Sequence, residues 1–210
     1  MQIEIWSDVI CPWCYIGKRR FEQALSQFDA RDEVNITWRS FELDPQSPSH
    51  LTETLEAMLS RKYGVSAQQA AEMNARVSGV AHDAGLEYKL ADARPGNTLD
   101  AHRLLHFAAA QGLGDRAIEC VMQAYFCEGL PVGDRAALAK LAPQFGIEES
   151  AALAMLESDA YVDAVRADEA RAAAFGISGV PFFVFDAKIG VSGAQPVEMF
   201  AQALQQAQSK

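Results

Sequence analysis

The sequence lacks any long hydrophobic run. None of its 210 residues belong to a stretch of about 18 apolar residues, so no segment is expected to span a membrane. The first residues also lack a basic stretch followed by an apolar one, so we expect no signal peptide and a cytoplasmic protein. Half of all residues are nonetheless hydrophobic, which is enough for a sizeable core.

Positive charge and cysteine are both scarce. Lys and Arg number 18 against 28 Asp and Glu, which gives a formal net charge of −10. This acidity disfavours nucleic acids and anionic membranes as partners, and we predict neither. Four cysteines are too few for a disulfide scaffold, and in a reducing cytoplasm a disulfide is usually transient.

Two of the four cysteines lie in the segment Cys11-Pro12-Trp13-Cys14, between a predicted strand and a predicted helix. Alternation over residues 2–7 predicts the strand, and apolar residues at helical spacing after Cys14 predict the helix. Pro12 then falls near the first helical position, where its missing N–H costs nothing. Cys11 is therefore expected to be the N-cap of the helix.

A cysteine at a helix N-terminus faces unpaired N–H groups and the positive end of the helix dipole, and both favour a thiolate. We therefore predict that Cys11 is the nucleophile and that Cys14, one turn later and more buried, is the resolving thiol. The alternatives are a zinc site or two buried thiols. Zinc usually requires a second cysteine pair at similar spacing, which the chain does not offer, so no metal is assigned.

The other two cysteines, Cys120 and Cys127, fall seven residues apart in one predicted helix. That spacing separates them by about 10 Å along the helix axis, whereas a disulfide requires Cα atoms within about 7 Å. We expect two buried free thiols rather than a second redox pair.

The remaining chain predicts β-containing ends around a helical middle. A second strand is expected at 34–41 and an irregular linker at 42–50, followed by about 130 largely helical residues. An apolar strand at 181–185 suits a central position in a sheet, and a shorter strand at 188–192 precedes a last amphipathic helix. Because neither end could cover a core alone, the two ends must share one sheet.

The fold predicted from this order is an α/β thioredoxin fold with a large α-helical insertion domain. Residues 1–45 and 176–210 would form a discontinuous thioredoxin-like domain, and residues 46–175 the inserted helical domain. The end of the insertion, residues 148–175, is expected to form one long helix or two.

Within the insertion, Asn97 is expected to be the N-cap of a helix, with Asp100 in a capping-box-like relation. His102 and His106 lie four apart on that helix and could present two imidazoles to a metal. A third ligand from elsewhere would be needed, and no Glu lies between them as in an HExxH motif, so we expect one capping or packing histidine and one half-buried histidine instead.

Pro181 opens the apolar strand, a position where a proline costs no ladder hydrogen bond. In the predicted layout its loop would lie against the turn between Cys11 and Cys14. A cis Val180–Pro181 bond would bring the ring close to the sulfurs and leave the Val180 backbone free to pair with an extended peptide. The residues alone leave the cis and trans isomers both open.

Two further side chains accompany the cysteines. Trp13 is expected to be exposed beside Cys11 and to offer an apolar platform to a peptide or small thiol, although packing on the inserted domain is the alternative. Asp8 either affects the basicity of the thiolate or shapes the connection before the helix, and the sequence does not decide between these roles.

Three ordered motifs resemble those of a known family. They read SDVICPWCYIGK at 7–18, NTLDAHRL at 97–104, and ISGVPFFVF followed by VSGAQP at 177–185 and 191–196. They resemble the motifs of the DsbA-like thioredoxin-fold proteins of the FrnE type, and the resemblance covers essentially the whole chain.

The resemblance implies a thiol–disulfide oxidoreductase with a helical insertion. It implies that Cys11 is the nucleophile, Cys14 the resolving thiol and Pro181 a cis proline. It also suggests that the helix start at Asn97 faces the cleft. A homodimer is an expectation from the family only.

Two related groups are similar in architecture. Exported DsbA enzymes usually carry a signal peptide and a histidine between the cysteines, where this chain has Pro12-Trp13, and this argues against strong oxidising power. Kappa-class glutathione transferases and 2-hydroxychromene-2-carboxylate isomerases typically have serine at the position of Cys11 and bind glutathione without cycling a disulfide. The presence of both cysteines favours redox chemistry.

The sequence thus predicts an enzyme that exchanges disulfides with protein or small-molecule thiols. No cofactor is expected, with glutathione at most a co-substrate. The alternatives are a glutathione-dependent transferase or isomerase, and a non-catalytic binding or chaperone module that uses the cleft between the domains. The predicted site comprises the catalytic Cys11 and Cys14 and the substrate-binding Pro12, Trp13, Val180, Pro181 and Asn97.

Overall fold

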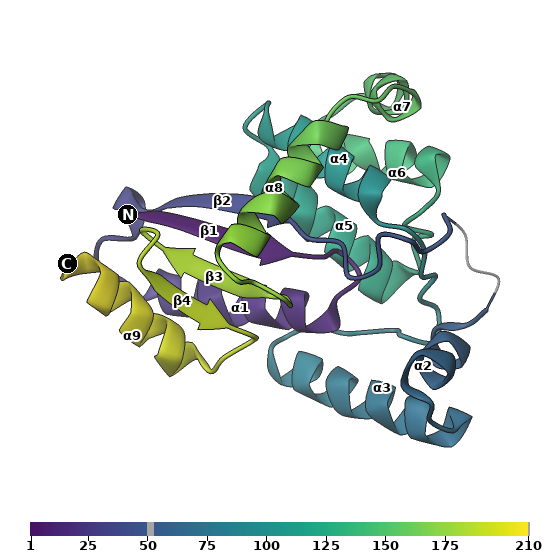
Figure 1. Ribbon diagram of the computed structural model, residues 1–210, viewed down its shortest axis with the longest axis horizontal. Helices are drawn as coiled ribbons and strands as arrows, with labels where there is room; N and C mark the ends of the chain where they lie inside the picture. Colours follow the sequence, from purple (N-terminus) through teal and green to yellow (C-terminus); the bar gives the residue numbers. More distant parts are fainter. Residues whose placement is uncertain (50–52, 210) are drawn as a thin grey trace.

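A computed structural model describes residues 1–49 and 53–209 (Figure 1). Within them, no helix is both long enough and apolar enough to cross a membrane. The α-helices are α1 (Pro12–Ser26), α2 (Leu55–Tyr63), α3 (Ala67–Asp83), α4 (Leu99–Ala109), α5 (Gly114–Glu128), α6 (Arg135–Leu141), α7 (Glu149–Glu157), α8 (Val162–Ala174) and α9 (Val197–Gln208).

The centre of the molecule is a four-stranded sheet in the order β2-β1-β3-β4. β1 (Gln2–Ser7) runs parallel to β2 (Asn35–Ser40) and antiparallel to β3 (Phe182–Phe185), and β4 (Ile189–Ser192) is antiparallel to β3. The two ends of the chain therefore share one sheet, as predicted.

One face of the sheet is covered by α1 and α9, which pack against each other (Figure 1). Side chains alternate between faces along a strand, and the members of one alternate set are aromatic or aliphatic. Burying each large apolar side chain contributes about 1.5–3 kcal/mol. This core contains Ile3, Ile5, Phe21, Phe183, Phe185, Phe200 and Leu204.

The opposite face of the sheet is covered by α8. Trp6 and Val184, from the other alternate set of β1 and β3, pack with Ala172 and Ile177. β3 is therefore buried on both faces, as its continuous apolar run predicted. α8 belongs by sequence to the predicted insertion, 46–175, yet contributes to the core of the sheet, and the division of the chain into two domains stays a prediction.

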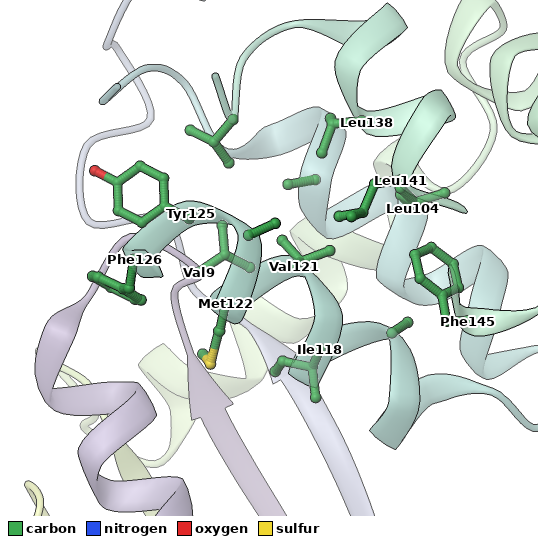
Figure 2. Packing of buried hydrophobic residues seen from close by; sticks show 14 of the residues in the cluster. Val9, Leu104, Ile118, Val121, Met122, Tyr125, Phe126, Leu138, Leu141 and Phe145 are labelled. Carbon is green, nitrogen blue, oxygen red and sulfur yellow. The ribbon is translucent and has the colours of Figure 1, made fainter. Parts of the chain in front are cut away.

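The helical region has its own core, centred on α5. Val9, just beyond the end of β1, belongs to the same buried cluster as Ile118, Val121 and Met122 of α5 (Figure 2). Cys11 and Cys14 belong to the same buried cluster. The turn that carries the cysteines is thus held between the sheet and the helical core.

Local predictions hold for most elements. Residues 148–175 form two helices, α7 and α8, because the chain turns at Tyr161, whose φ of 66° lies in the left-handed region. Residues 42–49 are irregular, as expected for the linker, and residue 50 of that prediction lies outside the described residues.

Candidate active site

The register of β1 and β3 brings Cys11 next to Pro181. Trp6 pairs with Phe182, so the segment that leaves β1 and the segment that enters β3 meet at one edge of the sheet. The Cys11 thiol lies 3.6 Å from the carbonyl oxygen of Val180. The Val180–Pro181 peptide bond is cis, the isomer that the resemblance implies.

Cys11 is the N-cap of α1, and Pro12 lies in the first turn, both as predicted. The backbone of Cys11 is extended, with φ −84° and ψ 111°, and its side chain makes no capping hydrogen bond. The amide of Cys14 donates to the Cys11 carbonyl at 2.9 Å. The Cys11 sulfur is therefore left for contacts outside the helix.

Both thiols are buried, Cys11 at 4% and Cys14 at 1% exposure. Burial raises the pKa of the Cys14 thiol well above its usual range, and the adjacent Cys11 sulfur raises it further. The backbone amide of Asp8 and the hydroxyl of Ser7 favour the thiolate but offset this only in part. Cys14 therefore holds its proton at neutral pH.

The turn between the cysteines is anchored from one side. The Tyr88 hydroxyl donates to the Pro12 carbonyl at 2.8 Å, and the Tyr88 ring stacks on Phe126 with centroids 4.6 Å apart. Trp13 is 44% exposed, as expected. The sequence did not point to Tyr88, because it lies in an irregular stretch without apolar periodicity.

A cavity of about 460 Å³ lies beside Pro12. Arg61, Lys62 and Asp44 contribute to its wall, so it combines apolar surface with charged groups of both signs. Its apolar lining includes Ile10, Pro12, Leu43, Leu55, Met58, Leu59, Tyr63, Leu90, Tyr125 and Phe126.

The prediction that Asn97 is an N-cap was wrong. Thr98 is the N-cap of α4, and Asn97 stands one residue earlier. Its Oδ1 accepts from the Leu99 amide at 2.9 Å and its Nδ2 donates to the Pro45 carbonyl at 3.2 Å. An asparagine that bonds the backbone two residues on makes a local turn instead of a cap. A substrate-facing role for Asn97 stays a prediction.

The capping-box relation of Asp100 is also absent. Its carboxylate instead pairs with Arg103 at 2.5 Å and with Arg135 at 2.6 Å. Asp100 and Arg103 both belong to α4, whereas Arg135 begins α6. The ion pair with Arg135 therefore links α4 to α6.

His102 and His106 face different carboxylates. His102 Nε2 lies 3.4 Å from Asp8 Oδ1, and His106 Nε2 lies 3.1 Å from Asp168 Oδ2. His102 is buried and His106 half-buried, as expected. Across residues 1–49 and 53–209, no group of three or more His, Cys, Asp or Glu side chains is placed to hold a metal ion.

Cys120 and Cys127 are free thiols on α5. They are half-buried, whereas the sequence predicted burial. Seven residues span almost two helical turns, so both lie on one side of α5, and that side packs only partly against the helical core. Partial burial raises the pKa of both thiols.

Comparison with known proteins gives a family and several relatives. The DSBA-like thioredoxin domain family matches residues 2–205. The probable DsbA oxidoreductase SCO1869 from Streptomyces coelicolor is similar in structure, with a TM-score of 0.96 and 44% identity over 100% of this chain and 91% of that one. An uncharacterized protein of Bacillus subtilis strain 168, YwbO, is 28% identical over 214 residues, or 100% of this chain and 98% of the relative.

A more distant likeness concerns the fold alone. A 2-hydroxychromene-2-carboxylate isomerase has a TM-score of 0.70 at 15% identity, over 98% of this chain and 95% of that one. The sheet order, the helical region and the placement of the cysteines agree with a DsbA-like thioredoxin fold. The chain belongs to the DSBA-like thioredoxin domain family.

Proposed function

We propose that the protein is a thiol–disulfide oxidoreductase of the FrnE type that cycles a disulfide between Cys11 and Cys14. One observation carries the proposal: a helix N-cap thiol faces the Val180 carbonyl, and a second, protonated thiol lies one turn behind it. That arrangement separates an attacking sulfur from a resolving sulfur.

In the reducing direction, the Cys11 thiolate attacks a substrate disulfide, R–S–S–R′. A bond forms between Cys11 and one substrate sulfur, and R′S⁻ leaves with the electron pair of the broken bond. Cys14 then attacks the Cys11 sulfur, the Cys11–Cys14 disulfide forms, and the second thiolate leaves. The oxidising direction is the reverse, with a substrate dithiol as the electron donor.

Substrate contacts would come from both sides of the Cys11 sulfur. Val180 and Pro181 frame it on one side, and an extended substrate could pair with the backbone there. Next to Cys11 in the chain are the exposed Trp13 and Pro12, and the cavity that Pro12 lines has an apolar lining that suits a peptide side chain or an apolar small thiol.

A thiol-trapping titration in glutathione buffers tests the proposal. The protein would carry Cys120→Ala and Cys127→Ala, so that intact mass and peptide mapping report Cys11 and Cys14 alone. We expect one reversible two-electron transition that links these two residues, and its midpoint would set the preferred direction. A lasting glutathione adduct on Cys11, with no bond to Cys14, would contradict the proposal.

The variant Cys14→Ser sharpens the test. A disulfide-cycling enzyme should stop after one turnover, trapped as a mixed disulfide on Cys11. A glutathione-dependent transferase or isomerase should bind glutathione tightly and keep its activity without Cys14. Multiple turnovers in the variant, at the rate of the parent, would therefore reject disulfide cycling.

A further inference from the structure

A tyrosine from outside α1 bonds the turn between the two cysteines. The Tyr88 hydroxyl donates to the Pro12 carbonyl at 2.8 Å, although 76 residues separate the two in the sequence. Within an α-helix, a carbonyl at this position also accepts from the amide four residues on. The bond from Tyr88 is therefore additional to the normal pattern of the helix and is not needed to satisfy the carbonyl.

Packing does not explain the hydroxyl. The Tyr88 ring stacks on Phe126 with centroids 4.6 Å apart and on Tyr15 with centroids 6.2 Å apart. The next residue, Lys89, donates its amide to the Phe126 carbonyl at 2.7 Å. Tyr88→Phe would keep both the stacking and this backbone bond. The hydroxyl therefore serves the one acceptor that it reaches in the turn between the cysteines.

The peptide group that accepts from Tyr88 also carries the amide of Trp13. An N-cap side chain usually accepts from the amide of the second or third helical residue, here Trp13 or Cys14. The Cys14 amide already donates to the Cys11 carbonyl, and the Pro12 nitrogen carries no proton. Among the described residues, the Trp13 amide donates to no backbone or side-chain acceptor. It is therefore the donor that the first turn leaves for the Cys11 sulfur.

Cys11 needs that donor when it is ionised. As a thiol, it donates to the Val180 carbonyl at 3.6 Å. A thiolate has no proton to donate there and is repelled by the carbonyl oxygen, whereas hydrogen bonds that it accepts stabilise its charge. The thiolate is also the form that attacks a disulfide. The Trp13 amide therefore matters most in the reactive form of Cys11.

Tyr88 can act on the thiolate through this peptide group. Resonance couples the carbonyl and the N–H of one peptide, so a donor to the carbonyl makes the N–H a stronger donor. Hydrogen bonds that are linked in this way strengthen one another by about 10–30%. Burial raises the pKa of Tyr88 well above its ordinary value, and the Cys11 sulfur raises it further. The hydroxyl therefore keeps its proton, and remains a donor, over the pH range in which thiols ionise.

We propose that Tyr88 is a positioning residue for the nucleophile: through its bond to the Pro12 carbonyl, it holds the first turn of α1 and strengthens the Trp13 amide as the donor to the Cys11 thiolate. The inference rests on the proposed function, because it concerns the sulfur that starts disulfide exchange. It assigns the irregular segment between α3 and α4, which carries Tyr88, a part in setting the reactivity of Cys11.

Other ionisable groups near the turn would influence a pH profile of Cys11. Burial raises the pKa of the neighbouring Cys14. Asp8 precedes the helix, and its carbonyl accepts from the Cys11 amide at 3.1 Å. Cys127 acts on Tyr88 from α5. Tyr88→Phe changes none of these groups, so a difference in pH profile between parent and variant reports the hydroxyl.

Alkylation of Cys11 by iodoacetamide at a series of pH values, followed by peptide mass mapping, tests the inference in reduced protein carrying Cys120→Ala and Cys127→Ala. We expect the midpoint of the profile to move up by about half a pH unit in Tyr88→Phe, because the thiolate loses part of one charge-assisted hydrogen bond. At a pH above both midpoints, the equilibrium with glutathione should shift about threefold toward the Cys11–Cys14 disulfide, because the reduced form is less stabilised.

The variant Tyr15→Phe is the matched control. Tyr15 belongs to the same aromatic stack, but its hydroxyl donates to Glu119 at 2.6 Å rather than to the Pro12 carbonyl. Its alkylation midpoint should match that of the parent, and urea unfolding separates any loss of stability from a change in the pH profile. An equal shift in both variants would assign the effect to loosening of the stack and would overturn the inference.

The parent alone provides a second test if the variants do not fold. When Cys11 loses its proton, the Trp13 amide proton should move downfield in NMR spectra with the same midpoint as the alkylation profile. A Trp13 signal that does not respond would overturn the inference, as would an unchanged midpoint in folded Tyr88→Phe. A parent that forms no Cys11–Cys14 disulfide in glutathione buffers would instead overturn the proposed function, and the two failures are thereby distinguished.

Discussion

The chain contains two pairs of cysteines in helices, and they differ in almost everything except the thiol. Cys11 and Cys14 lie at the first turn of α1, against the loop of Pro181. Cys120 and Cys127 lie within α5, half-buried and seven residues apart. At the start of α1, backbone N–H groups of the first turn have no partner within the helix and lie beside the Cys11 sulfur. Inside α5, the backbone amides already donate to carbonyl oxygens of the preceding turn.

We infer from this comparison that position, more than residue type, determines whether a thiol of this chain can take part in exchange. Burial raises the pKa of Cys120 and Cys127, and neither has an N-terminal helix end beside it. Burial also raises the pKa of Cys14, but the neighbouring Cys11 gives Cys14 a sulfur to attack. Four variants test this contrast, in order of decreasing effect.

Replacing the N-cap sulfur should produce the largest effect. Cys11→Ser removes the attacking thiolate, so the rate of disulfide exchange should fall by roughly three orders of magnitude or more. Turnover of a fluorescent mixed-disulfide peptide measures it. Cys120→Ser, assayed in parallel, serves as the control, and a comparable loss there would break the contrast between the two pairs.

Removing the exposed ring beside Cys11 should have a moderate effect. Trp13→Ala should raise KM for an aromatic peptide disulfide about two- to tenfold, because an aromatic contact contributes about 0.5–1.5 kcal/mol. Since Trp13 is 44% exposed, urea unfolding should change by less than about 1 kcal/mol. If KM for aromatic and for small substrates is unchanged in Trp13→Ala, Trp13 does not offer the substrate an apolar platform.

α5 also anchors α1, the helix that carries Cys11 and Cys14, through Glu119. Burial opposes the ionisation of Glu119, but hydrogen bonds from Arg19, Lys18 and Tyr15 outweigh it and lower its pKa to about 2. An unfolded glutamate titrates near 4.3, so the ion pairs stabilise the fold above that pH. This stabilisation is lost as the pH falls toward 2.

Glu119→Gln should therefore lower the free energy of unfolding at pH 7 by about 1 kcal/mol, after allowance for solvent screening. The difference from the parent should shrink between about pH 4.5 and pH 2. Urea unfolding at several pH values measures both quantities. A difference that stays constant with pH would show that Glu119 acts through packing alone.

The smallest effect is expected from the second pair. The double variant Cys120→Ala, Cys127→Ala should keep its rate of disulfide exchange, and it should lose at most about 1 kcal/mol of stability, because both side chains are only partly buried. Iodoacetamide labelling of the reduced parent should modify Cys11 before either of them. Loss of exchange in the double variant would assign α5 a redox role.

Much of this fold was predictable because its signals are local. The capping box of Ser66 and Gln69, the cap at Asp134 and the proline at the first turn of α1 each lie within a few residues of the helix they start. The prediction for Asn97 was wrong by one residue because Asn97 and Thr98 are both residue types that favour the N-cap. Thr98 is the N-cap of α4, and the Asn97 side chain forms a local turn with the Leu99 amide.

Contacts between residues far apart in the sequence could not be predicted. Tyr88 reaches Pro12 across 76 residues, and Asp8, just beyond the end of β1, meets His102 of α4. No periodicity marks either contact. The cis bond before Pro181 likewise followed from the family resemblance, since most such bonds are trans.

The hydrogen bond from Cys11 to Val180 spans 169 residues, and this separation has a consequence for biosynthesis. A ribosome adds about 5–20 residues per second, so the segment with Val180 emerges roughly ten to thirty seconds after the cysteines. During that interval β1 can pair only with β2, and the two thiols leave the ribosome before the loop that frames them exists. A nascent chain would therefore expose Cys11 and Cys14 to the surrounding thiols long before the proposed active site is complete.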